Sequence, residues 1–89
     1  MSIRTAKFNG ISYKIDISGP IDGITDSPKP SGKPTLAIFA DLGTRNGLET
    51  AIHEALHACN WSAAEDKVDS TARDLAWFLW RLGYRHEKV

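Results

Sequence analysis

The sequence contains a single cysteine, Cys59, and no apolar run of about 18 residues that could span a bilayer. One cysteine can form neither an internal disulfide nor a cysteine-rich zinc finger. The N-terminus, MSIRTAKFNG, lacks the apolar core of a secretory signal. We therefore expect a soluble, cytoplasmic protein with no membrane partner.

Neither sign of charge is in excess, because 11 basic side chains stand against 11 acidic ones in 89 residues. A balanced chain has no overall field that attracts nucleic acid, so we expect no nucleic-acid partner. Apolar residues make up 42% of the chain and charged residues 25%, which is typical of a folded globular protein. This length fits one small domain, residues 1–89, with a modest core.

The first half of the chain has three regions of different pattern. Residues 3–17 alternate apolar and polar side chains on both sides of Asn9-Gly10, a pair that favours a type I′ turn, and this predicts a β-hairpin. Residues 18–34 hold all four prolines and predict an irregular loop. The apolar run at residues 35–39 predicts a short strand.

The second half has the spacing of two helices. The first is predicted over residues 46–60 with Thr44 or Asn46 as its N-cap, and the second over residues 63–82 with Gly83 as its C-cap. Because the break between them is short, we expect an antiparallel helical hairpin. The expected fold class is α+β, with the β-hairpin and the further strand packed on the two helices.

Residues 53–57 read HEALH. His53 and His57 are four residues apart, so on a helix both imidazoles lie on one side and can bind one metal ion. This spacing is the pattern of hydrolytic zinc sites, in which Glu54 is the general base that takes a proton from a metal-activated water. The alternative is an ordinary amphipathic helix whose solvated face happens to carry two histidines.

A hydrolytic zinc site needs a third protein ligand. The predicted second helix has an apolar stripe that starts at Val68, and Glu65 falls on the same arc one turn earlier, with Asp69 at its edge. A carboxylate on an apolar stripe is costly to desolvate unless it is paired or bound to metal. We therefore predict Glu65 as the third ligand and Asp69 as the alternative. A competing explanation is a capping box, in which Ser62 caps the helix and Glu65 bonds back to it.

The segment LETAIHEALHA, followed by a short break and EDKV, resembles the small zincin-like metallopeptidase domains found in phage genomes. The resemblance covers Thr35 to about Leu82, and HEALH is its specific part. It implies zinc ligands His53, His57 and, in the gluzincin manner, Glu65. Larger gluzincins place the acidic ligand further beyond the second histidine than it lies here.

The resemblance also implies a function. The expected activity is that of a zinc-dependent metallopeptidase that hydrolyses peptide or amide bonds in a peptide or protein substrate, as a viral protein in the host cytoplasm. Zincins bind the substrate chain along an edge strand beside the active-site helix. By analogy, Leu36, Ala37 and Ile38 would pair with the substrate backbone.

Trp77 and Trp80 lie off the apolar stripe of the second helix, which is therefore apolar nearly all round. Either the N-terminal sheet covers this extra face, or the face binds a partner or a second copy in a homo-oligomer, since tryptophan is enriched at binding hot spots. The second option supports a rival function. The chain would then be a non-catalytic interaction module with a structural or inert metal site.

Overall fold

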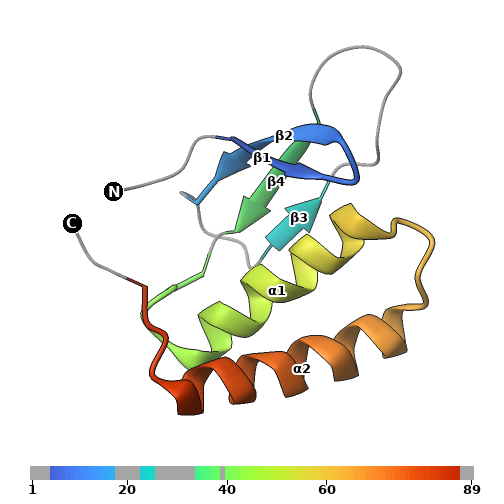
Figure 1. Cartoon of the computed structure of the whole chain (residues 1–89). Coiled ribbons are helices and arrows are strands. Elements are labelled where there is room, and N and C mark those ends of the chain that lie inside the picture. Colours follow the sequence, from blue (N-terminus) through green and yellow to red (C-terminus); the bar gives the residue numbers. More distant parts are fainter. Residues whose placement is uncertain (1–4, 18–22, 26–33, 39, 87–89) are drawn as a thin grey trace.

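The computed structural model describes residues 5–17, 23–25, 34–38 and 40–86. Within them the chain forms a four-stranded sheet and two helices, and the predicted α+β class is confirmed (Figure 1). The elements are β1 Thr5–Phe8, β2 Ile11–Asp16, β3 Gly23–Thr25, β4 Thr35–Ile38, α1 Arg45–Cys59 and α2 Glu65–Leu82. Neither helix in these residues is long and apolar enough to cross a membrane.

The predicted hairpin is confirmed, and its turn connects the sheet to the helices. Asn9 and Gly10 have φ angles of 53° and 78°, the positive values that a type I′ turn requires, and Phe8 pairs with Ile11 across the turn. The Asn9 side chain donates a hydrogen bond to the carbonyl of Cys59, the last residue of α1. The turn therefore holds the end of the helix that carries the two histidines.

The region predicted as an irregular loop, residues 18–34, contains a strand. Within it the structure describes residues 23–25 and Pro34, and Gly23–Thr25 forms β3, which pairs antiparallel with β4. A three-residue strand has too short a pattern to stand out from its proline-rich surroundings. Its strand geometry comes from pairing with β4, which no local sequence signal reports.

The strand order is β1-β2-β4-β3, so β4 lies inside the sheet. It pairs with β2 on one side and with β3 on the other. The expectation that Leu36, Ala37 and Ile38 pair with a substrate backbone is therefore wrong, because this strand has no free edge. All three residues are buried and contribute to the interior of the protein. The last residue of the predicted strand, residue 39, lies outside the described residues.

The molecule has three layers, with α1 between the sheet and α2 (Figure 1). The two helices run antiparallel side by side, as predicted, and α2 covers the side of α1 that faces away from the sheet. Among the described residues α2 contacts no strand. The expectation that the sheet covers the tryptophan face of α2 is therefore wrong.

The buried residues of α1 do not form one continuous stripe. They are Gly47, Glu54 and Ala58, whereas Cys59 at the end of the helix is exposed. A helix with neighbours on two sides divides its apolar residues between two half-buried faces, so no single stripe is enclosed. Ala58 joins Tyr13, Leu36 and Ile38 in the core between α1 and the sheet.

The start of α1 depends on a close approach of two backbone segments. Thr44 is the N-cap, as predicted, and its side chain accepts a hydrogen bond of 3.0 Å from the Gly47 amide. A Cβ atom on Gly47 would lie 1.9 Å from the carbonyl oxygen of Asp41. Only glycine allows the preceding loop to pass this close to the first turn of the helix.

Replacement of Gly47 with alanine therefore tests the close contact between the start of α1 and the preceding loop. Alanine in place of glycine normally stabilises a helix by about 0.5–1 kcal/mol. Here we expect the opposite, a loss of about 2 kcal/mol or more, because the new methyl group meets backbone atoms. Urea unfolding followed by circular dichroism measures the change. A gain in stability would contradict this account of the loop.

Tyr13 allows a second test of the core. Its side chain is fully buried against Phe8, and within the described part of the chain its hydroxyl has no hydrogen-bond partner. Burial, with a smaller contribution from Cys59, raises the pKa of the Tyr13 phenol. Because the pKa of this phenol is raised on folding, its ionisation does not lower the free energy of unfolding below about pH 10. The free energy of unfolding then decreases as the pH rises through the folded-state pKa.

We expect Tyr13→Phe to raise the free energy of unfolding at pH 7 by up to about 1 kcal/mol, because it removes a buried hydroxyl without a partner. The advantage of the variant should increase above pH 10, where only the wild-type chain must keep a buried phenol protonated. Urea titrations at the two pH values give the difference. Equal losses of stability in alkali for both proteins would be inconsistent with the burial of this phenol.

Candidate metal centre

The two histidines of HEALH lie on successive turns of α1 with their rings together. Their Nε2 atoms are 3.2 Å apart, and the ring centroids are 4.8 Å apart in an edge-to-face arrangement. Both side chains are mostly shielded, with exposed fractions of 22% for His53 and 15% for His57. Both rings thus direct the same nitrogen, Nε2, to one point, which solvent can reach.

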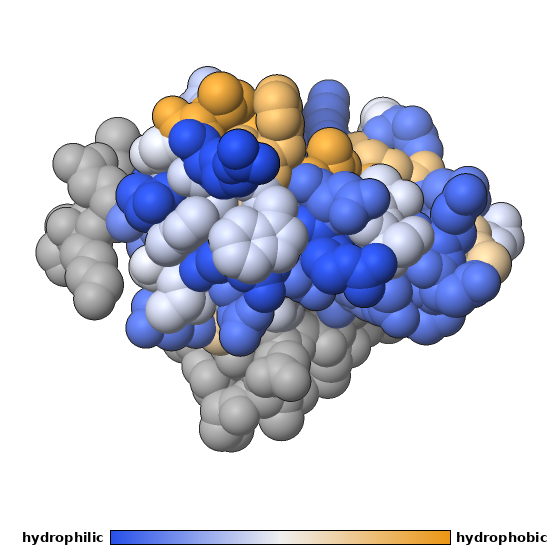
Figure 2. Space-filling view, turned by 90° about the horizontal axis from the view of Figure 1, so that it is seen from below, coloured by the Kyte–Doolittle hydropathy of each residue, from blue (hydrophilic) through white to orange (hydrophobic). Residues whose placement is uncertain are grey.

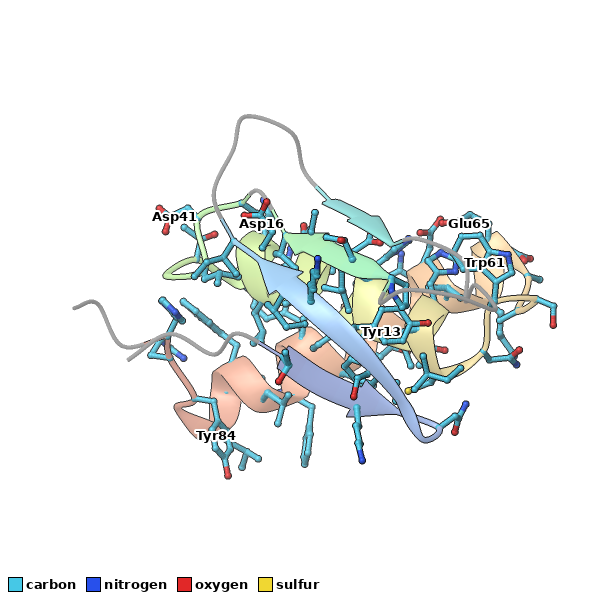
Figure 3. The ribbon with its side chains drawn as sticks, turned by 90° about the horizontal axis from the view of Figure 1, so that it is seen from above. Tyr13, Asp16, Asp41, Trp61, Glu65 and Tyr84 are labelled. Carbon is cyan, nitrogen blue, oxygen red and sulfur yellow. The ribbon has the colours of Figure 1, made fainter. Side chains whose placement is uncertain are left out.

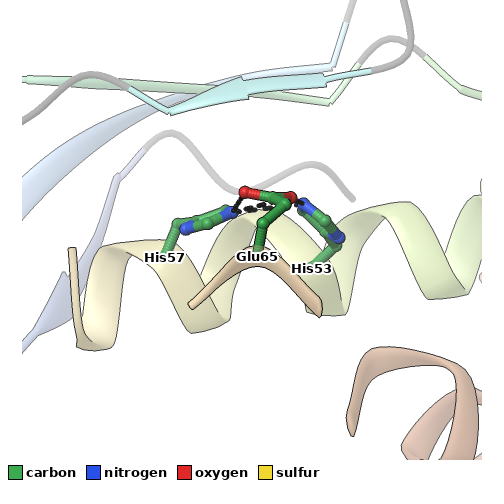
Figure 4. Close-up of side chains that lie close together, drawn as sticks. All are labelled: His53, His57 and Glu65. Atoms are coloured by element: carbon green, nitrogen blue, oxygen red, sulfur yellow. Dashed lines mark hydrogen bonds and ion pairs between the residues drawn. The ribbon is translucent and has the colours of Figure 1, made fainter. Parts of the chain in front are cut away.

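Glu65, the first residue of α2, completes this cluster from the second helix (Figure 4). Its Oε1 atom is 2.8 Å from Nε2 of His53 and 3.4 Å from Nε2 of His57. Its Oε2 atom is 3.1 Å from Nε2 of His57. The three residues predicted as metal ligands are therefore brought together, and they form a group that could hold a metal ion.

The spacing of the three donor atoms fits a small tetrahedral ion. Ligand atoms about 2.0–2.1 Å from a zinc ion at tetrahedral angles lie about 3.3–3.4 Å from one another. The triangle of the two Nε2 atoms and Oε1 has sides of 3.2, 2.8 and 3.4 Å. Movements of up to about half an ångström would make it one face of such a tetrahedron.

Asp69, the alternative ligand in the sequence prediction, lies behind His53 instead. Its Oδ1 atom is 3.1 Å from Nδ1 of His53, the ring nitrogen that faces away from Glu65. A carboxylate in this position accepts the Nδ1 proton and leaves a lone pair on Nε2. Asp69 therefore orients His53, a candidate ligand, whereas Glu65 of the same helix faces the centre.

The two carboxylate contacts of His53 favour positive charge at the centre. When Nδ1 donates to Asp69 in a neutral ring, Nε2 can only accept, and the carboxylate oxygen 2.8 Å away can also only accept. Two acceptors at this distance repel unless a cation or a proton lies between them. The arrangement therefore fits either a bound metal ion or a doubly protonated His53 between two carboxylates.

The short turn between the helices determines where Glu65 points. α1 is followed by its C-cap, Asn60, whose amide donates to the carbonyl of Leu56, and the amide of Ala63 donates to the carbonyl of Asn60 over 3.1 Å. α2 begins two residues later than predicted, and its N-cap, Ala64, makes no side-chain hydrogen bond. Ser62 donates to the Asn60 side chain, so the capping-box explanation of Glu65 is wrong. The Glu65 carboxylate is directed at the histidines.

Glu54 lies on a different side of α1 from the histidines. It is buried, 8% exposed, on the side that faces the sheet, between Ala51 one turn earlier and Ala58 one turn later. Glu54 therefore lies outside the group of candidate metal ligands.

Trp61 is a neighbour of the centre that the sequence did not reveal. Its ring centroid is 6.2 Å from that of His57, and Figure 3 shows it beside Glu65 where the two helices join. Trp61 is 49% exposed, so it presents apolar surface to solvent beside His57. Trp61 lies four residues after His57, a spacing that would place it on the same side of a helix as His57. This spacing could have indicated its position, although α1 ends before Trp61.

Comparison with protein-family models, with curated proteins and with solved structures found no match for this chain.

Zinc titration of single variants tests the roles of these residues. We expect wild-type protein to bind one zinc ion per chain, and Glu65→Ala or His57→Ala to abolish tight binding. Asp69→Ala should weaken zinc binding on the order of ten-fold, because His53 loses the partner that orients it. Isothermal titration calorimetry measures the dissociation constants.

Asp66→Ala is the matched control, since this exposed carboxylate follows Glu65 directly and bonds only to the Lys67 amide in the described structure. It should leave the affinity for zinc unchanged. Unchanged affinity in Glu65→Ala would show that the cluster is not a metal site and would favour the protonated His53.

Proposed function

We propose that this protein is a zinc-dependent metallopeptidase that hydrolyses peptide or amide bonds. The observation that carries the proposal is the triangle of donor atoms from His53, His57 and Glu65, at spacings close to those of a tetrahedral ion. Two imidazoles and one carboxylate are a ligand set of catalytic zinc sites, which leave one position for water.

The donor types favour zinc over the common alternatives. Magnesium and calcium prefer oxygen ligands, whereas two of the three donors here are imidazole nitrogens. The polar partner of His53, Asp69, is the kind of outer carboxylate that supports zinc-bound histidines. When bound, zinc would lower the pKa of a water molecule towards neutrality and polarise the substrate carbonyl.

Glu54 would be the general base that accepts the proton of the attacking water. It follows His53 in the chain and is buried on the sheet side of α1, where few water molecules compete for its carboxylate. This role would require the substrate to pass beside α1 at the edge of the sheet, so that the attacked carbonyl comes near both Glu54 and the metal ligands.

The position of β3 supports such a binding mode. In the strand order β3 is an end strand, and it contacts α1, which carries the metal group. An extended substrate could add to the outer edge of β3 by backbone hydrogen bonds and so pass beside α1. This strand replaces β4, which pairs on both of its edges, as the proposed substrate-binding strand.

A second candidate function rests on the exposed aromatic residues of α2. Trp77 and Phe78 are 48% and 59% exposed. Large aromatic side chains that are exposed in this way are commonly used to bind partners. On this alternative the metal would only join the two helices, and the chain would be a non-catalytic interaction module. The metallopeptidase requires Glu54 as a general base, whereas the interaction module does not require it. In neither case does Glu54 bind the metal.

The substitution Glu54→Gln distinguishes them. It keeps the size of the side chain but removes its ability to accept a proton. For a metallopeptidase we expect the cleavage rate of a fluorogenic peptide library to fall at least about 100-fold, with one zinc ion per chain still bound. Cleavage is measured by fluorescence, and zinc content is measured by inductively coupled plasma mass spectrometry.

Glu49→Gln is the control, because Glu49 lies on the same helix but pairs with Arg45 away from the centre. It should leave cleavage unchanged. Zinc-loaded wild-type protein that cleaves no member of the library would contradict the peptidase proposal and favour the interaction module. Cleavage that survives Glu54→Gln would contradict the role of Glu54 alone.

A further inference from the structure

The side of α2 that faces away from α1 carries a shallow apolar hollow with a charge at each end. Five residues line this hollow of about 490 Å³, which we call the α2 outer face: Asp74, Trp77, Phe78, Arg81 and Leu82. Trp77, Phe78 and Leu82 are all about half exposed or more. Figure 2 looks onto the molecule from below, the side of α2, and shows apolar residues in orange directly beside strongly polar ones in blue.

Trp80 does not belong to this face. The guanidinium of Arg85 covers its ring at 3.3 Å, and the residue is half-buried. Trp77 has the guanidinium of Arg45 over its ring at 4.4 Å but still exposes about half of its surface. The apolar contact that α2 can offer is therefore centred on Trp77 and Phe78, and not on the two tryptophans expected from the sequence.

The charges of the α2 outer face are spaced symmetrically about its aromatic residues. Asp74 and Arg81 are seven residues apart, so they lie nearly in line along the helix with about 10.5 Å between them. The midpoint between them falls between Trp77 and Phe78. Within the described residues neither Asp74 nor Arg81 forms an ion pair, so both charges are available to a partner.

We propose that the α2 outer face binds a second copy of this chain, with the two α2 helices antiparallel across a twofold axis between Trp77 and Phe78. Each Asp74 then faces Arg81 of the other copy, which gives two identical ion pairs, one at each end. At the axis the aromatic residues of one copy meet those of the other. A twofold interface requires such a self-complementary surface.

The distribution of charge on this face favours a second copy over an unrelated partner. A surface for a basic or acidic protein would carry mainly one sign of charge, whereas this face has one acid and one base at equal distances from its centre. An apolar centre with a polar rim is also the usual composition of a stable protein interface. Antiparallel pairing buries the apolar centre and pairs both charges at the same time.

This dimer leaves the metal centre accessible. Glu65 lies about 19 Å from the proposed axis along α2, given a rise of about 1.5 Å per residue. It faces α1, on the other side of the helix from the outer face. Each copy would therefore keep its own centre, and the proposal does not depend on zinc binding or peptide cleavage.

Charge-reversal variants test the pairing by analytical ultracentrifugation. Wild-type protein should approach the mass of two chains as its concentration rises. Arg81→Glu places two acids at each end of the interface and Asp74→Lys places two bases there, so each variant alone should dimerise at least about ten-fold more weakly. An equal mixture of the two variants should dimerise as the wild type does, because Asp74 then faces Arg81 at one end and the two introduced charges attract at the other.

Lys7→Glu is the control for net charge, since Lys7 is exposed on β1 and the sheet does not contact α2. It should dimerise as the wild type does. Circular dichroism verifies that every variant is folded. Wild-type protein that stays monomeric up to about 1 mM would overturn the proposal, and this face would then serve another protein. A mixture of the two variants that fails to associate would overturn the antiparallel pairing.

Discussion

The structure of the site depends on one interaction, the approach of the Glu65 carboxylate to the paired Nε2 atoms of His53 and His57. The histidines alone are two polar residues on a half-buried helix face. The acid comes from the other helix, so the turn at residues 60–64 must bring the start of α2 back over the last turns of α1. The hydrogen bond from Asn9 to Cys59 holds the same end of α1 to the sheet. Both connections stabilise the region where His53 and His57 of α1 meet Glu65 of α2.

Much of this arrangement could be predicted because its signals are local. Asn9-Gly10 specifies a turn whatever surrounds it, and the structure has the expected positive φ angles there. The cap residue Thr44 and the C-cap Gly83, with φ of 101°, likewise act through their own backbone neighbours. The four-residue spacing of the histidines fixes their common side on any helix. The position of Glu65 could be predicted because a short break between two helices allows few geometries.

The parts that could not be predicted are set by partners far away in the sequence. β3 is a strand because β4 lies beside it, and its insertion turns the expected edge strand into an interior one. The buried face of α1 depends on having the sheet on one side and α2 on the other, which the pattern of a single helix cannot reveal. Asp69 and Glu65 are both acids of the first turns of α2, and only their positions relative to His53 separate a ligand from the residue that orients it. The exposure of Trp77 and Phe78 follows from the same layering, since α2 contacts α1 alone among the described elements.

The imidazoles of His53 and His57 and the carboxylate of Glu65 would together surround one cation. Anomalous diffraction from zinc-soaked crystals, recorded on both sides of the zinc absorption edge, would locate this ion. We expect one strong peak per chain about 2.0–2.1 Å from Nε2 of His53, Nε2 of His57 and an oxygen of Glu65, with Asp69 still bonded to Nδ1 of His53. Side chains of Glu65 and His57 turned away from each other, with no anomalous peak between them in excess zinc, would contradict it.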